Sequence, residues 1–196
     1  MDLIERVKGI LLRPSQEWQT IAGETTSISD LYKSYVGILA AIGPVASIIG
    51  MSFVGIGGFR IPITSSLASG IVSYVLTLVG VYVLALIIDA LAPIFTGEKN
   101  INQAFKVAAY SYTLGWVLGI LWLIPALSPL MILGLYGLYL LYLGLPVLMK
   151  SPQDKSMGYT LAVVVAAIVI FVVIGAVSHV FVPSPTPVMP GMAGHG

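Results

Sequence analysis

Four long stretches without a charged residue constrain this chain more than any motif does. They hold 26 residues (34–59), 28 residues (61–88), 43 residues (107–149) and 41 residues (156–196). A helix that crosses a membrane needs about 20 predominantly apolar residues. Only 9% of the 196 residues are charged, whereas about 25% is usual in soluble domains. We therefore expect a membrane protein rather than a soluble one.

The lengths of these stretches give the number of spans. The first two stretches hold one helix each, whereas the third is too long for a single crossing. Its centre reads IPALSP (124–129), and proline cannot continue a helix without losing a backbone hydrogen bond, so we expect two helices joined by a tight turn. The last stretch holds one more helix. The predicted fold is all-α, a bundle of five transmembrane helices at about 33–56, 64–91, 104–124, 129–149 and 157–182.

The N-terminal segment is expected to form two short helices outside the spans. Its first residues place apolar side chains at spacings of three and four, with charged residues between them, which is typical of an amphipathic helix. Pro14 ends this helix, and Ser15 is a candidate cap for a second helix that places Trp18 and Ile21 on one side. Such helices either lie flat in the lipid headgroup layer or pack under the bundle, and both alternatives stay open.

The distribution of lysine and arginine predicts the orientation. With five spans, eight of these residues fall on one side of the membrane and Arg60 alone falls on the other. Because cytoplasmic loops carry the excess of Lys and Arg, the N-terminus is expected in the cytoplasm and the C-terminus outside. The eight residues are Arg6, Lys8, Arg13, Lys33, Lys99, Lys106, Lys150 and Lys155.

The predicted organisation has three parts. A cytoplasmic amphipathic segment covers 1–30, the five-helix domain covers 31–182, and an outward-facing disordered tail rich in proline and glycine covers 183–196. The N-terminus is not a cleavable signal peptide, because charged residues interrupt its apolar run.

Asp89 is the single charge within LALIIDALAPIF (84–95). It falls in the last turns of the second predicted helix, where the helix dipole disfavours a carboxylate and a nearby cation would help. Lys106 begins the third helix on the same side, so we expect an interfacial Asp89–Lys106 pair, with Lys99 as the alternative partner. A role of Asp89 in transport or proton relay is the competing interpretation, since ionisable groups inside membranes are functional candidates.

Small residues and tyrosines indicate how the helices pack. Gly115 and Gly119 lie four apart, as do Ala46 and Gly50, and such pairs let two helices approach closely. Phenol groups in an apolar surrounding need hydrogen-bond partners, so we expect some tyrosines to bond across helices and not to line a pathway. The tyrosines concerned are Tyr110, Tyr112, Tyr136, Tyr139 and Tyr142.

The sequence carries no catalytic constellation. It has no cysteine, no zinc-protease or nucleophile-elbow motif and no P-loop, so we expect neither an enzyme nor a cofactor. The net charge of +1 shows no footprint for a nucleic acid. Only the tail holds a candidate metal pattern, in which Met189, Met192 and His195 recur at every third residue and suit copper.

Three segments together resemble the Yip (Ypt-interacting protein) domain family, in its bacterial branch. They are SDLYKSY (29–35), FKVAAYSYT (105–113) and YLLYLGLPVLMKSPQDKSMGYT (139–160), whose order and spacing agree with the family across most of residues 1–182. The resemblance implies five spans in the inner membrane of a bacterium, a cytoplasmic N-terminus and an outward C-terminus. Eukaryotic members are associated with Rab-type GTPases, but this chain lacks their Gly-Pro after the first motif, so Rab binding is not expected.

Two functional hypotheses follow. In the first, the chain organises membrane or partner proteins, or copies of itself, through a cytoplasmic face that includes Asp30, Tyr32 and the amphipathic segment 1–24. Its expected partners are membrane lipids and other proteins. In the second, the chain is a small transporter or channel whose candidate residues are Asp89, Lys106, Tyr110 and the tyrosines of the fourth helix.

Overall fold

The computed structural model describes residues 2–55 and 60–181, and 87% of it is helical with no strand in the described part. Five of its helical segments are long and apolar enough to cross a membrane, which confirms the predicted fold class. The described parts of these spans are Ile28–Val54, Ile63–Phe95, Ile101–Leu123, Pro125–Leu148 and Gln153–Ile170.

The first span is broken into short pieces. Its α-helical parts alternate with two π-helical segments, and a turn at Ala41 interrupts it at mid-length. This turn lies three residues before Pro44, which has no N–H to donate back toward the preceding helical turn. The pieces are α3 (Ile28–Leu31), η1 (Tyr32–Val36), α4 (Gly37–Ala40), α5 (Ile42–Ile49) and η2 (Gly50–Val54).

The other four spans are more continuous. The third and fourth spans meet at Ile124, within the predicted IPALSP turn, but Pro129 lies inside a 3-10 helix instead of in the turn. In chain order the elements are α6 (Ile63–Leu91), η3 (Ala92–Phe95), α7 (Ile101–Ser111), α8 (Thr113–Leu118), η4 (Gly119–Leu123), η5 (Pro125–Leu135), α9 (Tyr136–Leu148), η6 (Gln153–Lys155) and α10 (Ser156–Phe181).

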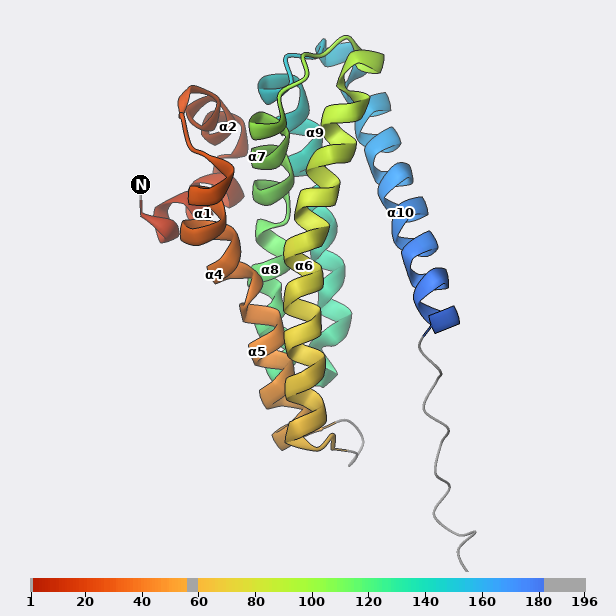
Figure 1. Cartoon of the computed structure of the whole chain (residues 1–196). Helices are drawn as coiled ribbons and strands as arrows, with labels where there is room; N and C mark the ends of the chain where they lie inside the picture. The colour runs from red at the N-terminus through yellow and green to blue at the C-terminus, as the bar shows by residue number, and fades with distance from the viewer. Residues whose placement is uncertain (1, 56–59, 182–196) are drawn as a thin grey trace, which may run out of the picture.

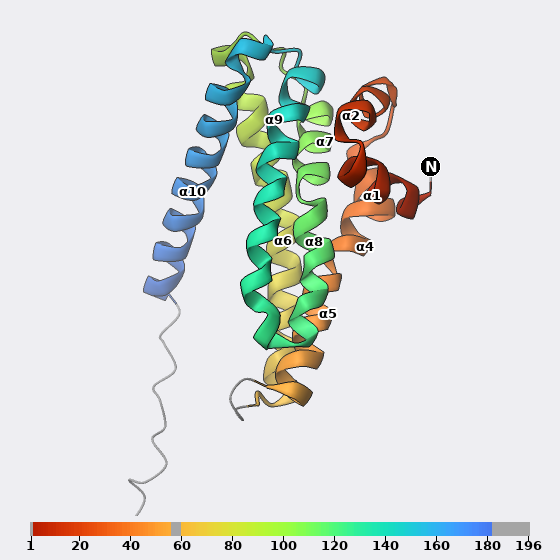
Figure 2. The same cartoon turned by 180° about the vertical axis from the view of Figure 1, so that it is seen from behind.

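The long helices run side by side, and α6 lies beside α5, α7 and α10 (Figure 1). The third span is the most buried of the five, so it forms the centre of the bundle. Helix α10 meets α6 and α9 near the loops at its start and leans away from them toward its end (Figures 1 and 2). We call the end of the bundle that holds the loops before α7 and before α10 the basic end.

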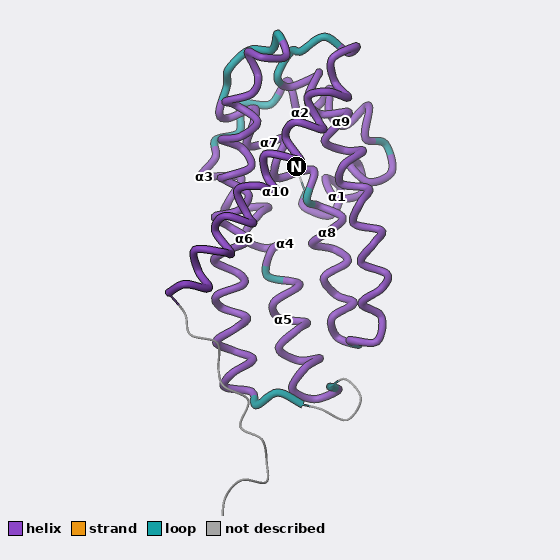
Figure 3. Tube along the Cα trace, turned by 90° about the vertical axis from the view of Figure 1, so that its right-hand side faces the viewer, coloured by secondary structure: helices purple, strands orange, loops and turns teal. Residues whose placement is uncertain are grey.

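The two N-terminal helices, α1 (Leu3–Leu12) and α2 (Pro14–Gly23), confirm the predicted pair. They pack against the side of the bundle next to α7 and α9 and not beneath it (Figures 1 and 3). Ser15 is not the cap of α2, because Pro14 already occupies the first helical turn and Arg13 holds the cap position without a side-chain hydrogen bond.

Candidate functional site

The N-terminal helices are seated on the bundle by two fully buried side chains. Trp18 and Ile21 of α2 are both 0% exposed. The Trp18 ring lies against α9 where Gly144 leaves room, since a Cβ at that position would sit 2.7 Å from the ring. Trp18 also meets Tyr110 of α7 edge-on, with ring centroids 6.1 Å apart. These contacts of α2 with α7 and α9 hold the N-terminal segment against the bundle.

A buried ion-pair group completes this seat, and we call Arg6, Glu17, Glu24 and Lys106 the clasp. Arg6 of α1 is only 4% exposed. Its guanidinium donates to Glu17 Oε1 of α2 at 2.5 Å and to Glu24 after the end of α2. The absence of a side chain at Gly9 leaves room for the Glu17 carboxylate, because a Cβ on Gly9 would lie 2.3 Å from Glu17 Oε2. The clasp therefore ties α1 to α2.

Arg6 keeps its positive charge among these neighbours. Burial by itself lowers the pKa of Arg6, but the hydrogen bond to Glu24 and the carboxylates of Glu24 and Glu17 outweigh that effect. The net result is a pKa of Arg6 above its ordinary value. The guanidinium also lies over the Tyr110 ring, 5.5 Å from its centroid, at a distance at which cation–π attraction adds to the pairing.

The predicted Asp89–Lys106 pair is wrong. Lys106 is 3% exposed and donates instead to the backbone carbonyls of Ile21, at 3.2 Å, and Glu24. The physical reason is that the carbonyls at the C-terminal end of α2 carry a partial negative charge, so they attract the Lys106 ammonium group and accept its hydrogen bonds. The sequence does not show that α2 folds back onto the third span, so this partner could not be foreseen.

Asp89 is left without the expected cations. Its Oδ1 is buried and has no hydrogen-bond partner in the part of the chain that the structure describes. Lys99, the alternative partner, makes no ion pair within that part either. In the neighbouring loop it is Glu98 that pairs with a lysine, Lys150, at 2.7 Å, and both side chains are exposed.

The two candidates on the proposed working surface differ in role. Asp30 is exposed and accepts a 2.6 Å hydrogen bond from Ser27, whose hydroxyl in turn accepts from the Asp30 N–H and caps the first span. Tyr32 is half-buried, donates to the Leu78 carbonyl of α6 at 2.8 Å and packs on Phe105 of α7. Asp30 is therefore available to a partner, whereas Tyr32 links three spans.

Tyrosine hydroxyls form hydrogen bonds between helices, as expected. Most of these tyrosines are not among the five named from the sequence. Of those five, Tyr136 donates across helices, to the Leu11 carbonyl of α1 at 3.0 Å. Tyr110 contributes its ring, which lies 4.8 Å from that of Tyr35 in the first span. The Tyr35 hydroxyl bonds Thr113 of α8 at 2.7 Å. Sequence reasoning missed Tyr35 and the clasp carboxylates, for which the spacing of residues gives no signal.

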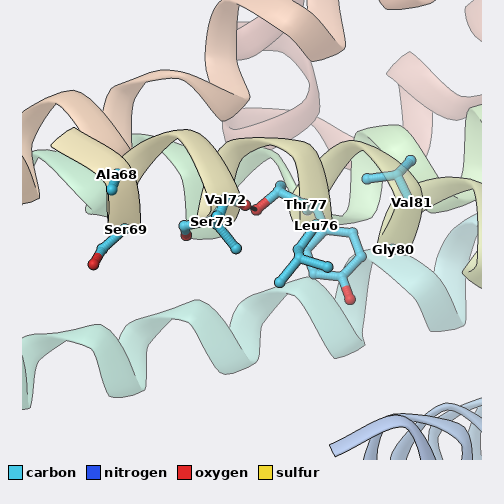
Figure 4. Close-up of a pocket in the computed structure, with 9 residues that line it drawn as sticks. Ala68, Ser69, Val72, Ser73, Leu76, Thr77, Gly80 and Val81 are labelled. Carbon is cyan, nitrogen blue, oxygen red and sulfur yellow. Dashed lines mark hydrogen bonds between the residues drawn. The ribbon is translucent and has the colours of Figure 1, made fainter. Parts of the chain in front are cut away.

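Cavities within the spans do not involve the predicted pathway residues. One of them, with a volume of about 670 Å³, follows one side of α6, where the hydroxyl residues Ser69, Ser73 and Thr77 recur at helical spacing (Figure 4). Asp89, Lys106 and the three fourth-helix tyrosines do not line this cavity or two further ones within the spans, whereas Tyr112 lines this cavity and one of those two. These three cavities therefore give no geometric support to a pathway through Asp89 and Lys106.

No metal site is built by the residues that the structure describes, among which no three His, Asp or Glu side chains come together. The candidate metal ligands Met189, Met192 and His195 lie outside the described residues.

Comparisons with known proteins place the chain among membrane proteins. The model of the Yip1 domain family matches residues 8–174. Inner membrane protein YohC of Escherichia coli strain K12 is 24% identical over 184 residues, which cover 89% of this chain and 94% of that protein. The protein of the same name from Escherichia coli O6:H1 gives the same values. No solved structure shows a significant match.

Proposed function

The chain belongs to the Yip1 domain family, and from this membership and the geometry of the clasp we propose that it is a non-enzymatic inner-membrane protein that organises partner proteins at the cytoplasmic surface. The membrane assignment draws on the five spans and on the relative named as an inner membrane protein. The orientation draws on the eight-to-one distribution of Lys and Arg, which favours the basic end in the cytoplasm.

The observation that carries the proposal is the seating of α1 and α2. A flexible arm would lose conformational entropy when a partner binds it. Here the buried clasp and Trp18 hold the two helices in place in advance, so a preformed surface stands at the start of the first span. The exposed residues next to it, among them Ser29, Asp30 and Lys33, are free to contact another protein.

Crosslinking in native membranes tests the proposal. A photoreactive amino acid replaces Ser29 at this surface or, as a control, Thr64 at the opposite end of the bundle, and both positions are exposed. We expect a discrete protein adduct from position 29 and none of that mass from position 64. Asp30→Asn is expected to weaken the adduct several-fold, whereas Asp154→Asn, at another exposed carboxylate, leaves it unchanged.

Deletion of residues 1–24 is a poorer test than these substitutions. The deletion removes Ile10, Trp18 and Ile21 from the buried core, so loss of binding would not be separable from loss of folding. Identical adduct patterns at positions 29 and 64, or an adduct indifferent to Asp30→Asn, would contradict the proposed working surface.

A further inference from the structure

A polar cavity lies between the N-terminal helices and the first span, and we propose that it binds the zwitterionic ammonium–phosphate headgroup of a membrane phospholipid. The cavity has a volume of about 510 Å³. Its lining combines one cation, one carboxylate, three hydroxyl residues and two aromatic rings: Arg6, Glu24, Thr25, Thr26, Ser34, Tyr35 and Tyr110. The proposed partner-binding role does not require this site, so the two can fail separately.

Arg6 supplies the partner for a phosphate. A guanidinium carries more N–H donors than its two pairings, to Glu17 and Glu24, consume. Since Arg6 is 4% exposed and lines the cavity, any remaining donor that faces it needs an acceptor there. Arginine binds phosphate through short charge-assisted hydrogen bonds. Thr25 and Thr26 line the same cavity, and their hydroxyl groups can add neutral hydrogen bonds.

Glu24 and Tyr35 supply the partner for an ammonium group. The Glu24 side chain is 30% exposed, so it pairs with Arg6 and still reaches the cavity. The Tyr35 ring lines the same space and offers an aromatic face to a cation. The clasp holds two cations and two carboxylates. A neutral, zwitterionic headgroup leaves this charge balance intact, whereas an anionic headgroup adds an uncompensated negative charge.

The place of the cavity favours a lipid over a soluble molecule. Three of its lining residues, Leu31, Ser34 and Tyr35, belong to the first turns of the first span. Headgroups lie at the ends of membrane spans, where the hydrocarbon layer gives way to water. Leu3 and Leu31 add an apolar edge beside the polar wall, which suits the junction of a headgroup with its acyl chains.

Native mass spectrometry of the full-length, delipidated protein tests the site. Phosphatidylethanolamine and phosphatidylglycerol with identical acyl chains are offered at equal concentration in mixed micelles. We expect the ethanolamine lipid to be retained in preference, and Thr25→Val/Thr26→Val to reduce its affinity roughly tenfold. The matched control Thr20→Val/Thr64→Val changes two exposed threonines outside the cavity and should bind as the unaltered protein does.

Three results would overturn the proposal. Equal retention of the two lipids means that the cavity does not select an ammonium–phosphate headgroup. A preference that survives Thr25→Val/Thr26→Val means that the lipid sits elsewhere. Displacement of the lipid by glycerophosphoethanolamine at equal concentration means that the ligand is a soluble headgroup and not a membrane lipid.

Discussion

At the scale of single residues, the clasp turns on Arg6. Its partner Glu17 is largely shielded from water, with 12% of its side chain exposed, and Glu24 is more accessible at 30%. Removing the guanidinium leaves the Glu17 carboxylate without its partner, which is more damaging than removing an exposed pair. Arginine also forks between two acceptors, a geometry that lysine does not reproduce.

We expect Arg6→Met to weaken the seating of α1 by about 2 kcal/mol, and Arg6→Lys to weaken it by less. Hydrogen exchange of α1 amides measures both effects.

The pH dependence of this seating follows from the raised pKa of Arg6. A raised pKa contributes its full stability at all pH values below the ordinary value, and this contribution is lost as the pH rises from the ordinary value through the folded-state value. The contribution of Arg6 should therefore stay constant from about pH 7 to pH 10, and its loss by pH 9 would contradict the assignment.

At the scale of elements, glycines that look equivalent in the sequence have different surroundings. Gly119 of η4 faces Gly43 of α5 so closely that a Cβ on Gly119 would lie 2.8 Å from the Gly43 Cα. A Cβ on Gly115, one helical turn earlier, would meet nothing within 4 Å. The spacing of four predicted a close approach at both positions, but of the two only Gly119 lacks room for a Cβ.

Gly119→Ala should therefore push α5 away from η4, at a cost of about 1–3 kcal/mol typical of overpacking. Gly115→Ala is the matched control and should be neutral or slightly stabilising, because alanine favours helix over glycine. Thermal unfolding in detergent compares the two. Equal values of Tm for both variants would show that the α5–η4 contact carries no stability.

The elements differ in how far the sequence predicts them. Uncharged stretches locate the spans, because a charge in hydrocarbon is costly whatever the surrounding fold. Proline predicted the turn after the third span for an equally local reason. The partners of Lys106 and Arg6 were not predictable, since they depend on how α1 and α2 fold back onto helices far along the chain.

At the scale of the whole molecule, the two ends of the bundle differ in construction. The largest fully buried side chains include Trp18 of α2, Phe105 near the start of α7 and Tyr159 near the start of α10. Helix α2 and the starts of α7 and α10 lie toward the basic end (Figure 1). The opposite half exposes apolar side chains such as Ile63, Val72 and Ile132, as expected where lipid replaces a protein core. The half with exposed apolar side chains therefore suits the hydrocarbon layer. The basic end, with its buried core and the clasp, suits the membrane boundary.

The orientation of these two ends is open to a direct measurement, because the chain has no native cysteine. Ile61→Cys lies next to Arg60 at the opposite end and Gln153→Cys at the basic end, both positions are exposed, and neither change alters the charge count. With the basic end in the cytoplasm, a membrane-impermeant maleimide should label Ile61→Cys in spheroplasts. It should label Gln153→Cys only after the membrane is opened. A permeant maleimide, which should react with both, is the control for reactivity, and the reverse labelling pattern would place the clasp outside and remove the cytoplasmic role proposed for it.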